Sequence, residues 1–216
     1  MLNKRRNQRG FTLVEVIVMM SIVVIGVLAT LSVANLAVRA SDANEQRVAA
    51  VNLSREGVEL VRAIRDSNWA AASEGSGASC WNHYAQSPEQ ARAVPYTNSC
   101  TDAIGSPGST WHFVVYPNTG NGMPYMQRVP SANTTDPAYR LCRVGTPALY
   151  RPYASACPSG QTFFRRVSIS VGKDLGTDAD DGRRKYSYRI RSYVTWPDND
   201  RPEVLVEEYI TDWRKP

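Results

Sequence analysis

The sequence predicts an α+β protein in which a long amino-terminal helix packs on an antiparallel β-sheet. Three observations predict this fold class. Residues 16–38 carry no charge, residues 41–69 repeat apolar side chains at helical spacing without a proline, and the chain after residue 161 alternates as strands do. With 43% hydrophobic and 21% charged residues, the composition is that of a folded protein and excludes collagen-like and disordered chains.

The positive charge of the chain is concentrated at its amino terminus. Residues 1–10 hold Lys4, Arg5, Arg6 and Arg9 and no acidic side chain, and they supply most of the formal net charge of +5. A basic cluster directly before an apolar stretch predicts a cytoplasmic amino terminus, because such clusters stay on the cytoplasmic side of a membrane. The rest of the chain is nearly neutral, so the positive net charge is only weak evidence that the folded part binds nucleic acid.

The apolar stretch is long enough to cross a membrane. A helix over residues 16–38 is about 34 Å long, and a bilayer has a hydrocarbon core of about 30 Å. A cleaved secretory signal peptide has a much shorter apolar region. Glu15 lies at the start of the stretch, where a carboxylate is costly in hydrocarbon and needs a partner.

The residues around Glu15 resemble a known processing signal. The basic leader is followed by Gly10-Phe11-Thr12-Leu13-Val14-Glu15 and then by the apolar run. This order resembles the prepilin signal of type IV pilins and pseudopilins. The resemblance implies that a membrane aspartyl peptidase cuts between Gly10 and Phe11 and methylates the new amino group of Phe11. It also implies that Glu15 is the assembly residue.

Charge pairing gives Glu15 a physical role in assembly. Cleavage after Gly10 would create an ammonium group on Phe11, and the Glu15 carboxylate of a neighbouring subunit could neutralise it inside an apolar bundle. Only a correctly staggered neighbour would supply this partner. Many pilins of this type carry a proline in the middle of the helix, whereas residues 26–33 contain none here, so we expect no interruption of the helix.

Residues 41–69 predict the second, amphipathic half of the same helix. We expect one helix from Phe11 to about Ser67, whose apolar side packs on the sheet of the same chain. The predicted apolar stripe comprises Ala50, Leu53, Gly57, Leu60, Val61 and Ile64. The run from Ser54 to Asn68 also resembles the equivalent segment of minor pilins.

Residues 70–160 predict a loop region with one strand, Thr110–Tyr116. All four cysteines, Cys80, Cys100, Cys142 and Cys157, lie here, and an even number favours disulfides in an oxidising compartment. We favour the local pairs Cys80–Cys100 and Cys142–Cys157, while two other connectivities stay open. A zinc site is the alternative, but no C-x-x-C spacing supports it.

Residues 161–216 predict an antiparallel meander of three strands, over residues 163–171, 185–196 and 203–213. The connections between them are rich in turn-forming residues. The alternation of the last strand slips at Glu207 and Glu208, which suggests a bulge there.

The sequence contains no complete catalytic or cofactor motif. His83 and His112 lack a spaced third partner, and the run from Asp178 to Asp181 and Gly182 fails the spacing of an EF-hand. We therefore predict no enzymatic activity, no cofactor and no metal site. Calcium binding near Asp178–Asp181 and capture of an unidentified surface ligand or DNA by the tyrosine-rich head stay as alternatives.

Together these features predict a structural subunit, most like a minor pilin. We divide the chain into five segments: a cleaved leader (1–10), a membrane and assembly half of the helix (11–40), an amphipathic half of the helix (41–69), a disulfide-bearing loop region (70–160) and an antiparallel meander (161–216). The implied partners are prepilin peptidase, other pilin subunits, the inner-membrane assembly platform and membrane lipid. The protein would cross the inner membrane once and then enter an extracellular filament. The alternatives are a pseudopilin of a type II secretion or DNA-uptake machine and an uncut, membrane-anchored adhesin.

Overall fold

The computed structural model describes residues 12–73, 84, 104, 108–117, 124–145, 149–152, 157, 162–177, 184–197 and 203–211. The chain forms two compact units, Met1–Gln46 and Arg47–Pro216, which we call the amino-terminal unit and the head. One helix, α1 (Leu13–Ser73), contributes to both units. The fold class is α+β, as the sequence predicts.

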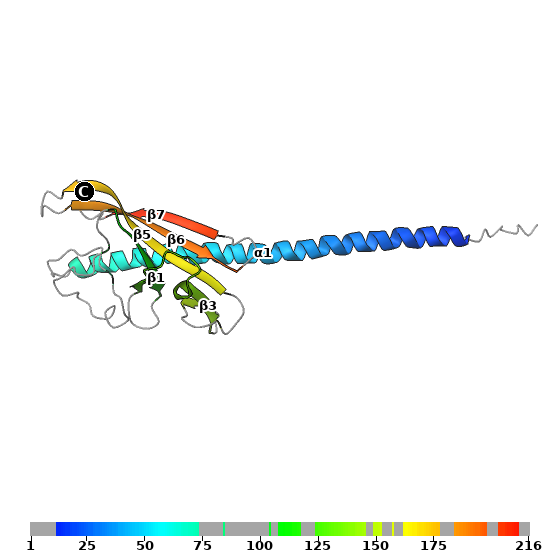
Figure 1. Cartoon of the computed structure of the whole chain (residues 1–216), viewed down its shortest axis with the longest axis horizontal. Helices are drawn as coiled ribbons and strands as arrows, with labels where there is room; N and C mark the ends of the chain where they lie inside the picture. Colours follow the sequence, from blue (N-terminus) through cyan, green and yellow to red (C-terminus); the bar gives the residue numbers. More distant parts are fainter. Residues whose placement is uncertain are drawn as a thin grey trace, which may run out of the picture. The chain divides into compact units, whose positions relative to one another are not determined.

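The described residues of the head form a seven-stranded sheet in which every pairing is antiparallel. Its strands are β1 (Thr110–Tyr116), β2 (Tyr125–Arg128), β3 (Arg140–Val144), β4 (Leu149–Pro152), β5 (Thr162–Thr177), β6 (Arg184–Thr195) and β7 (Glu203–Ile210). A short 3₁₀ helix, η1 (Pro137–Tyr139), precedes β3. The strands lie beside the cyan, carboxyl-terminal half of α1 (Figure 1).

The long strand β5 organises the sheet. Along one edge it pairs with β6, and along the other it pairs first with β3, through residues 162–164, and then with β1, through residues 167–170. β7, β2 and β4 lie outside β6, β1 and β3 respectively. The meander β5–β6–β7 confirms the predicted three-strand arrangement, and β1 has the predicted bounds. The sequence did not predict β2, β3 and β4, which all lie within residues 70–160.

The predicted bulge at Glu207 and Glu208 is wrong. β7 keeps one continuous register with β6, from Thr195 opposite Glu203 to Tyr188 opposite Ile210. The sheet irregularity lies instead between β5 and β6, after Val171. Gly172 is required there, because a Cβ at this position would lie 2.6 Å from the Ser187 Oγ and 2.9 Å from the Ser187 carbonyl oxygen.

The core of the head lies between α1 and one face of the sheet. One buried cluster joins Val58, Val61 and Ile64 of α1 to strand residues that include Phe113, Met126, Val167 and Ile190. A second cluster joins Ala50 and Leu53 to Leu141, Phe163, Val194 and Trp196. Since buried helix residues recur every three or four positions, the amphipathic stripe packs on the sheet of its own chain, as predicted.

Candidate functional site

Helix α1 begins with a capping arrangement around Thr12 and Glu15. The Glu15 backbone N–H donates to the Thr12 Oγ1 at 3.3 Å, and the Val16 N–H donates to the Thr12 carbonyl oxygen at 3.2 Å. Thr12 thus occupies the N-cap and Glu15 the third helical position, which is the spacing of a capping box. A carboxylate in the first turn also suits the positive end of the helix dipole. The signal T-x-x-E in the sequence could have predicted this capping box.

Gly10 and Phe11, the predicted processing residues, lie outside the described part of the chain. Glu15 itself is the third residue of α1.

The amino-terminal unit exposes apolar side chains on all sides of the helix. Every large apolar side chain from Leu13 to Val38 is between 41% and 77% exposed. Monomeric soluble proteins rarely expose continuous apolar surface on this scale, and such surfaces mark contact with membranes or other proteins. By its length and composition, this helix is able to cross a membrane.

The hydroxyl groups within this apolar surface are satisfied by the helix itself. Ser21 donates to the Ile17 carbonyl oxygen at 2.8 Å, Thr30 to that of Val27 at 2.8 Å, and Ser32 to that of Leu28 at 2.9 Å. Polar groups that keep a partner inside the helix are tolerated in hydrocarbon. The helix also continues through residues 26–33, which agrees with the absence of proline there. The amino-terminal unit is thus chemically suited to membrane anchoring.

Within the head, α1 lies close to the sheet at Gly57. A Cβ on Gly57 would lie 2.6 Å from the Ser192 Oγ, 3.1 Å from the Arg165 Cδ and 3.3 Å from the Val167 Cγ2. One turn earlier, the buried Ser54 hydroxyl donates to the Ser192 carbonyl oxygen at 2.7 Å. Gly57 and Ser54 therefore let the helix backbone lie directly on β5 and β6.

Arg165 is a buried cation between the helix and two strands. Its side chain is only 1% exposed, and it donates to the Leu53 carbonyl oxygen at 3.2 Å, the Glu56 Oε2 at 3.0 Å and the Val115 carbonyl oxygen at 3.1 Å. Burial lowers the pKa of the guanidinium, and the Glu56 carboxylate opposes this effect. Arg165 thereby connects α1, β5 and β1 through one charged group.

A second ion pair connects α1 to β7. Arg62 pairs with Glu208, and it also pairs with Glu59 at 2.6 Å. The hydrogen bond that Arg62 donates to the Glu208 carboxylate is the main reason that the pKa of Arg62 is raised. Glu208 points to the helix side of β7, between Val206 and Ile210. Its charge disrupts the apolar pattern of the strand, and Arg62 explains why a carboxylate stands there.

The run from Ser54 to Asn68 is thus the docking segment of the helix. Its members that face the sheet or pair with it include Ser54, Glu56, Gly57, Val58, Val61, Arg62, Ile64 and Asn68. Sequence reasoning found Gly57, Val61 and Ile64 but missed Val58, which is 2% exposed. It also missed Arg165 and Glu208, the charged groups on the sheet that pair with Glu56 and Arg62.

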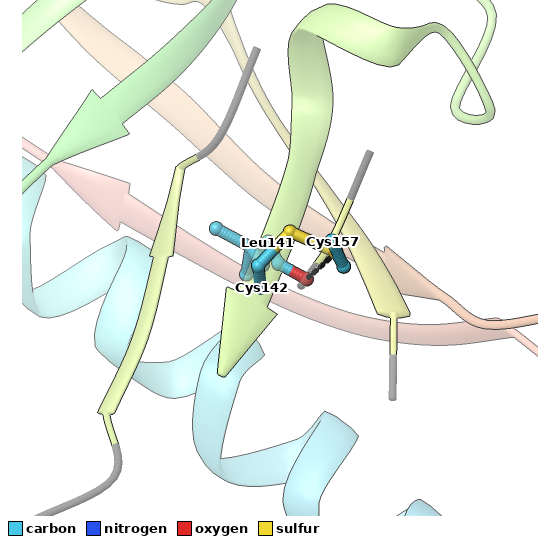
Figure 2. The surroundings of a disulfide bond; sticks show 3 residues. All are labelled: Leu141, Cys142 and Cys157. Atoms are coloured by element: carbon cyan, nitrogen blue, oxygen red, sulfur yellow. Dashed lines mark hydrogen bonds between the residues drawn. A yellow bond between two sulfur atoms is a disulfide. The ribbon is translucent and has the colours of Figure 1, made fainter. Parts of the chain in front are cut away.

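The structure contains a disulfide between Cys142 and Cys157, one of the two local pairs that the sequence favours. It links β3 to the segment before β5, with 5.3 Å between the Cα atoms, and the Cys157 Sγ lies 3.8 Å from the Leu141 carbonyl oxygen (Figure 2). Cys80 and Cys100 lie outside the described residues.

The described residues include no group of three His, Cys, Asp or Glu side chains able to hold a metal ion. The run from Asp178 to Gly182 and His83 are outside the described ranges. His112 lies on β1, where its Nδ1 is 2.9 Å from the Ser168 Oγ. Burial, followed by the nearby Arg166 cation, lowers the pKa of His112.

Comparison with known proteins identifies the amino-terminal motif. A family described as the prokaryotic N-terminal methylation motif matches residues 5–31, which include Gly10, Phe11 and Glu15. No curated protein and no solved structure matches the chain. The motif indicates a structural subunit. The chain thus carries the type IV pilin signature on a long apolar helix that is followed by an antiparallel sheet, an α+β architecture like that of pilins.

Proposed function

We propose that the protein is a minor pilin, a structural subunit of a type IV pilus-like surface filament. The observation that carries this proposal is the division of α1 into two chemically different halves. The first half exposes apolar side chains all round and carries one carboxylate, Glu15, whereas the second half buries one face against the sheet. A subunit of this kind has one half of the helix for membrane and neighbouring subunits and another for holding the head.

In this proposal, prepilin peptidase removes residues 1–10 and methylates the amino group of Phe11. The inner-membrane assembly platform then moves the subunit from the membrane, where it is anchored with its amino terminus in the cytoplasm, into an extracellular filament. Contacts between neighbouring helices would be heterologous, so that they propagate along a fibre instead of closing into a ring. The head, with its disulfide and docking segment, stays folded throughout.

Glu15 would act in assembly through its charge. The Phe11 ammonium group of one subunit and the Glu15 carboxylate of the next would neutralise each other in the apolar interior of the filament. A subunit in the wrong register would leave both charges unpaired, which costs several kcal/mol in a low-dielectric medium. The pair would therefore select the stagger between subunits.

Two variants of Glu15 test this role. Glu15→Gln keeps a side chain that suits the third position of a capping box but loses the charge, so we expect normal processing and strongly reduced incorporation into sheared filaments. Glu45→Gln is the matched control, because Glu45 is an exposed carboxylate farther along α1. Gly10→Val supplies the unprocessed reference band. Incorporation of Glu15→Gln at the level of the control would show that charge pairing does not select the register.

The membrane and sheared-filament fractions also distinguish a pilin from the two alternative functions, a pseudopilin and an uncut adhesin. A processed subunit that is confined to the cell envelope and required for protein export or DNA uptake would be a pseudopilin. A full-length chain in the membrane would be an uncut adhesin.

A further inference from the structure

We propose that Asn133 is an acceptor for an N-linked sugar. Asparagine in the triplet N-x-S/T, with x other than proline, is the acceptor of N-glycosylation in exported proteins. The chain contains two such triplets, Asn52-Leu53-Ser54 and Asn133-Thr134-Thr135. The structure distinguishes sharply between them. The inference rests on the proposed function in one respect, namely that the head is exported.

In the Asn133 triplet, the threonine that defines the motif already contacts the asparagine side chain. The Asn133 Oδ1 accepts hydrogen bonds from the Thr135 N–H at 3.1 Å and from the Thr135 Oγ1 at 3.0 Å. The hydroxyl that defines the triplet therefore lies on the carboxamide oxygen of the acceptor. Donors on this oxygen stabilise the negative charge that develops there when Nδ2 gives up a proton, as donors in an oxyanion hole do.

The turn presents this asparagine at the surface. Asn133 and Thr135 are exposed and lie between β2 and β3, outside any helix or strand. The Asp136 N–H closes the turn on the Asn133 carbonyl oxygen at 3.2 Å. On the preceding side, the hydroxyl of the buried Tyr139 donates to the Ser131 carbonyl oxygen. A transferase would thus meet an accessible acceptor in a turn that is anchored at both ends.

The Asn52 triplet fails on the same criteria. It lies within α1, and the Ser54 side chain is fully buried. The Ser54 hydroxyl donates to the Ser192 carbonyl oxygen at 2.7 Å, so it is directed at β6 and is engaged in docking the helix. Asn52 therefore serves as an internal negative control.

The reaction is a glycosyl transfer from a lipid-pyrophosphate-linked sugar. The Asn133 Nδ2 forms a bond to the anomeric carbon of the sugar as the bond from that carbon to the pyrophosphate oxygen breaks. The electron pair of the broken bond leaves with the lipid pyrophosphate, and Nδ2 loses one proton to a base of the transferase. No oxidant or reductant is needed.

Mass spectrometry of the full chain from its native host tests the proposal. We expect the peptide that contains Asn133 to carry one or more sugar residues on that asparagine, and the peptide that contains Asn52 to carry none. Asn133→Asp is the decisive variant, because aspartate keeps the oxygen that accepts from Thr135 but has no amide nitrogen to modify. It should lose the sugar and keep the thermal stability of the head. Thr135→Ser should keep the sugar, Thr135→Val should lose it, and Asn52→Gln should change nothing.

Two outcomes would overturn the proposal. One is an unmodified Asn133 in every exported chain, and the other is a sugar attached to the hydroxyl of Ser131, Thr134 or Thr135. The amino-terminal peptide of the same sample reports on processing at Gly10 and Phe11. Failure of the sugar site and failure of the pilin assignment would therefore be seen separately.

Discussion

The buried Arg165 makes Glu56 the most informative position in the head. We consider Glu56→Gln, which keeps the size and hydrogen-bonding oxygen of the side chain and removes only its charge. Arg165 would then keep its bonds to the Leu53 and Val115 carbonyl oxygens but lose the carboxylate at 3.0 Å. The remaining cation would be buried without a counter-charge among the described residues, which is strongly unfavourable.

The exposure of the two partners sets the magnitude. Removing one partner of a fully buried ion pair costs about 3–5 kcal/mol. Here Arg165 is 1% exposed but Glu56 is 38% exposed, and water already weakens the attraction on that side. We therefore expect a loss of about 1–3 kcal/mol in the free energy of unfolding. For a domain of this size, this corresponds to a decrease in Tm of about 3–10 °C.

Glu59→Gln is the matched control, one helical turn away. Glu59 is 61% exposed, and its partner Arg62 also pairs with Glu208, so the change should cost less than about 1 kcal/mol. The assay is thermal unfolding of the full chain in detergent with the disulfide intact, monitored by circular dichroism. In an Arg165→Met background, which lacks the buried guanidinium, Glu56→Gln should have little effect on the free energy of unfolding. Equal losses for the two glutamate variants, or an unchanged loss in the Arg165→Met background, would refute this reasoning.

Three further predictions concern the head. Gly57→Ala should lower the free energy of unfolding by up to about 2 kcal/mol, since crowding against the Ser192 Oγ at 2.6 Å outweighs the helix propensity of alanine, and Ser192→Ala should restore part of the loss in denaturant titrations. Replacing Cys142 and Cys157 by serine should cost about 3 kcal/mol, because their disulfide closes a loop with a sequence separation of 15. A reductant should then lower the Tm less than it does in the parent chain. Burial lowers the pKa of His112 in the folded state, so the unfolded chain binds a proton first as the pH falls below about 6.5. The free energy of unfolding should therefore decrease as the pH falls through this range, and His112→Gln should remove this part of the pH dependence of Tm.

The sequence was sufficient to predict a helix or strand where the pattern of apolar residues was regular or the strand-forming residues were concentrated. β1 was predicted with its observed bounds, because nearly all its residues are aromatic or β-branched. The meander β5–β6–β7 and the buried stripe of α1 were predicted because their apolar residues recur at regular spacing. β2 and β4, at four residues each, are too short to show a period, and β4 ends in Pro152, which argues against a strand in sequence analysis.

The docking contacts could not be predicted, because each depends on a partner distant in the chain. Arg165 stands at an inward-facing position of β5, and Glu208 stands at one of β7. In the sequence, a charge at such a position only interrupts the apolar alternation and does not indicate its partner. Only the fold shows that Glu56 and Arg62 of the helix neutralise them. For the same reason, Gly57 was assigned to the apolar stripe without the close contact with Ser192 that makes glycine necessary there.

The amino-terminal mass of the protein, measured in membrane and sheared-surface fractions of its native host, tests the central claim most directly. The proposed function predicts a chain that begins at Phe11, carries one added methyl group on its amino terminus and occurs in sheared filaments. A chain that still begins at Met1 and is found only in the membrane would contradict it and would identify the protein as an anchored surface protein.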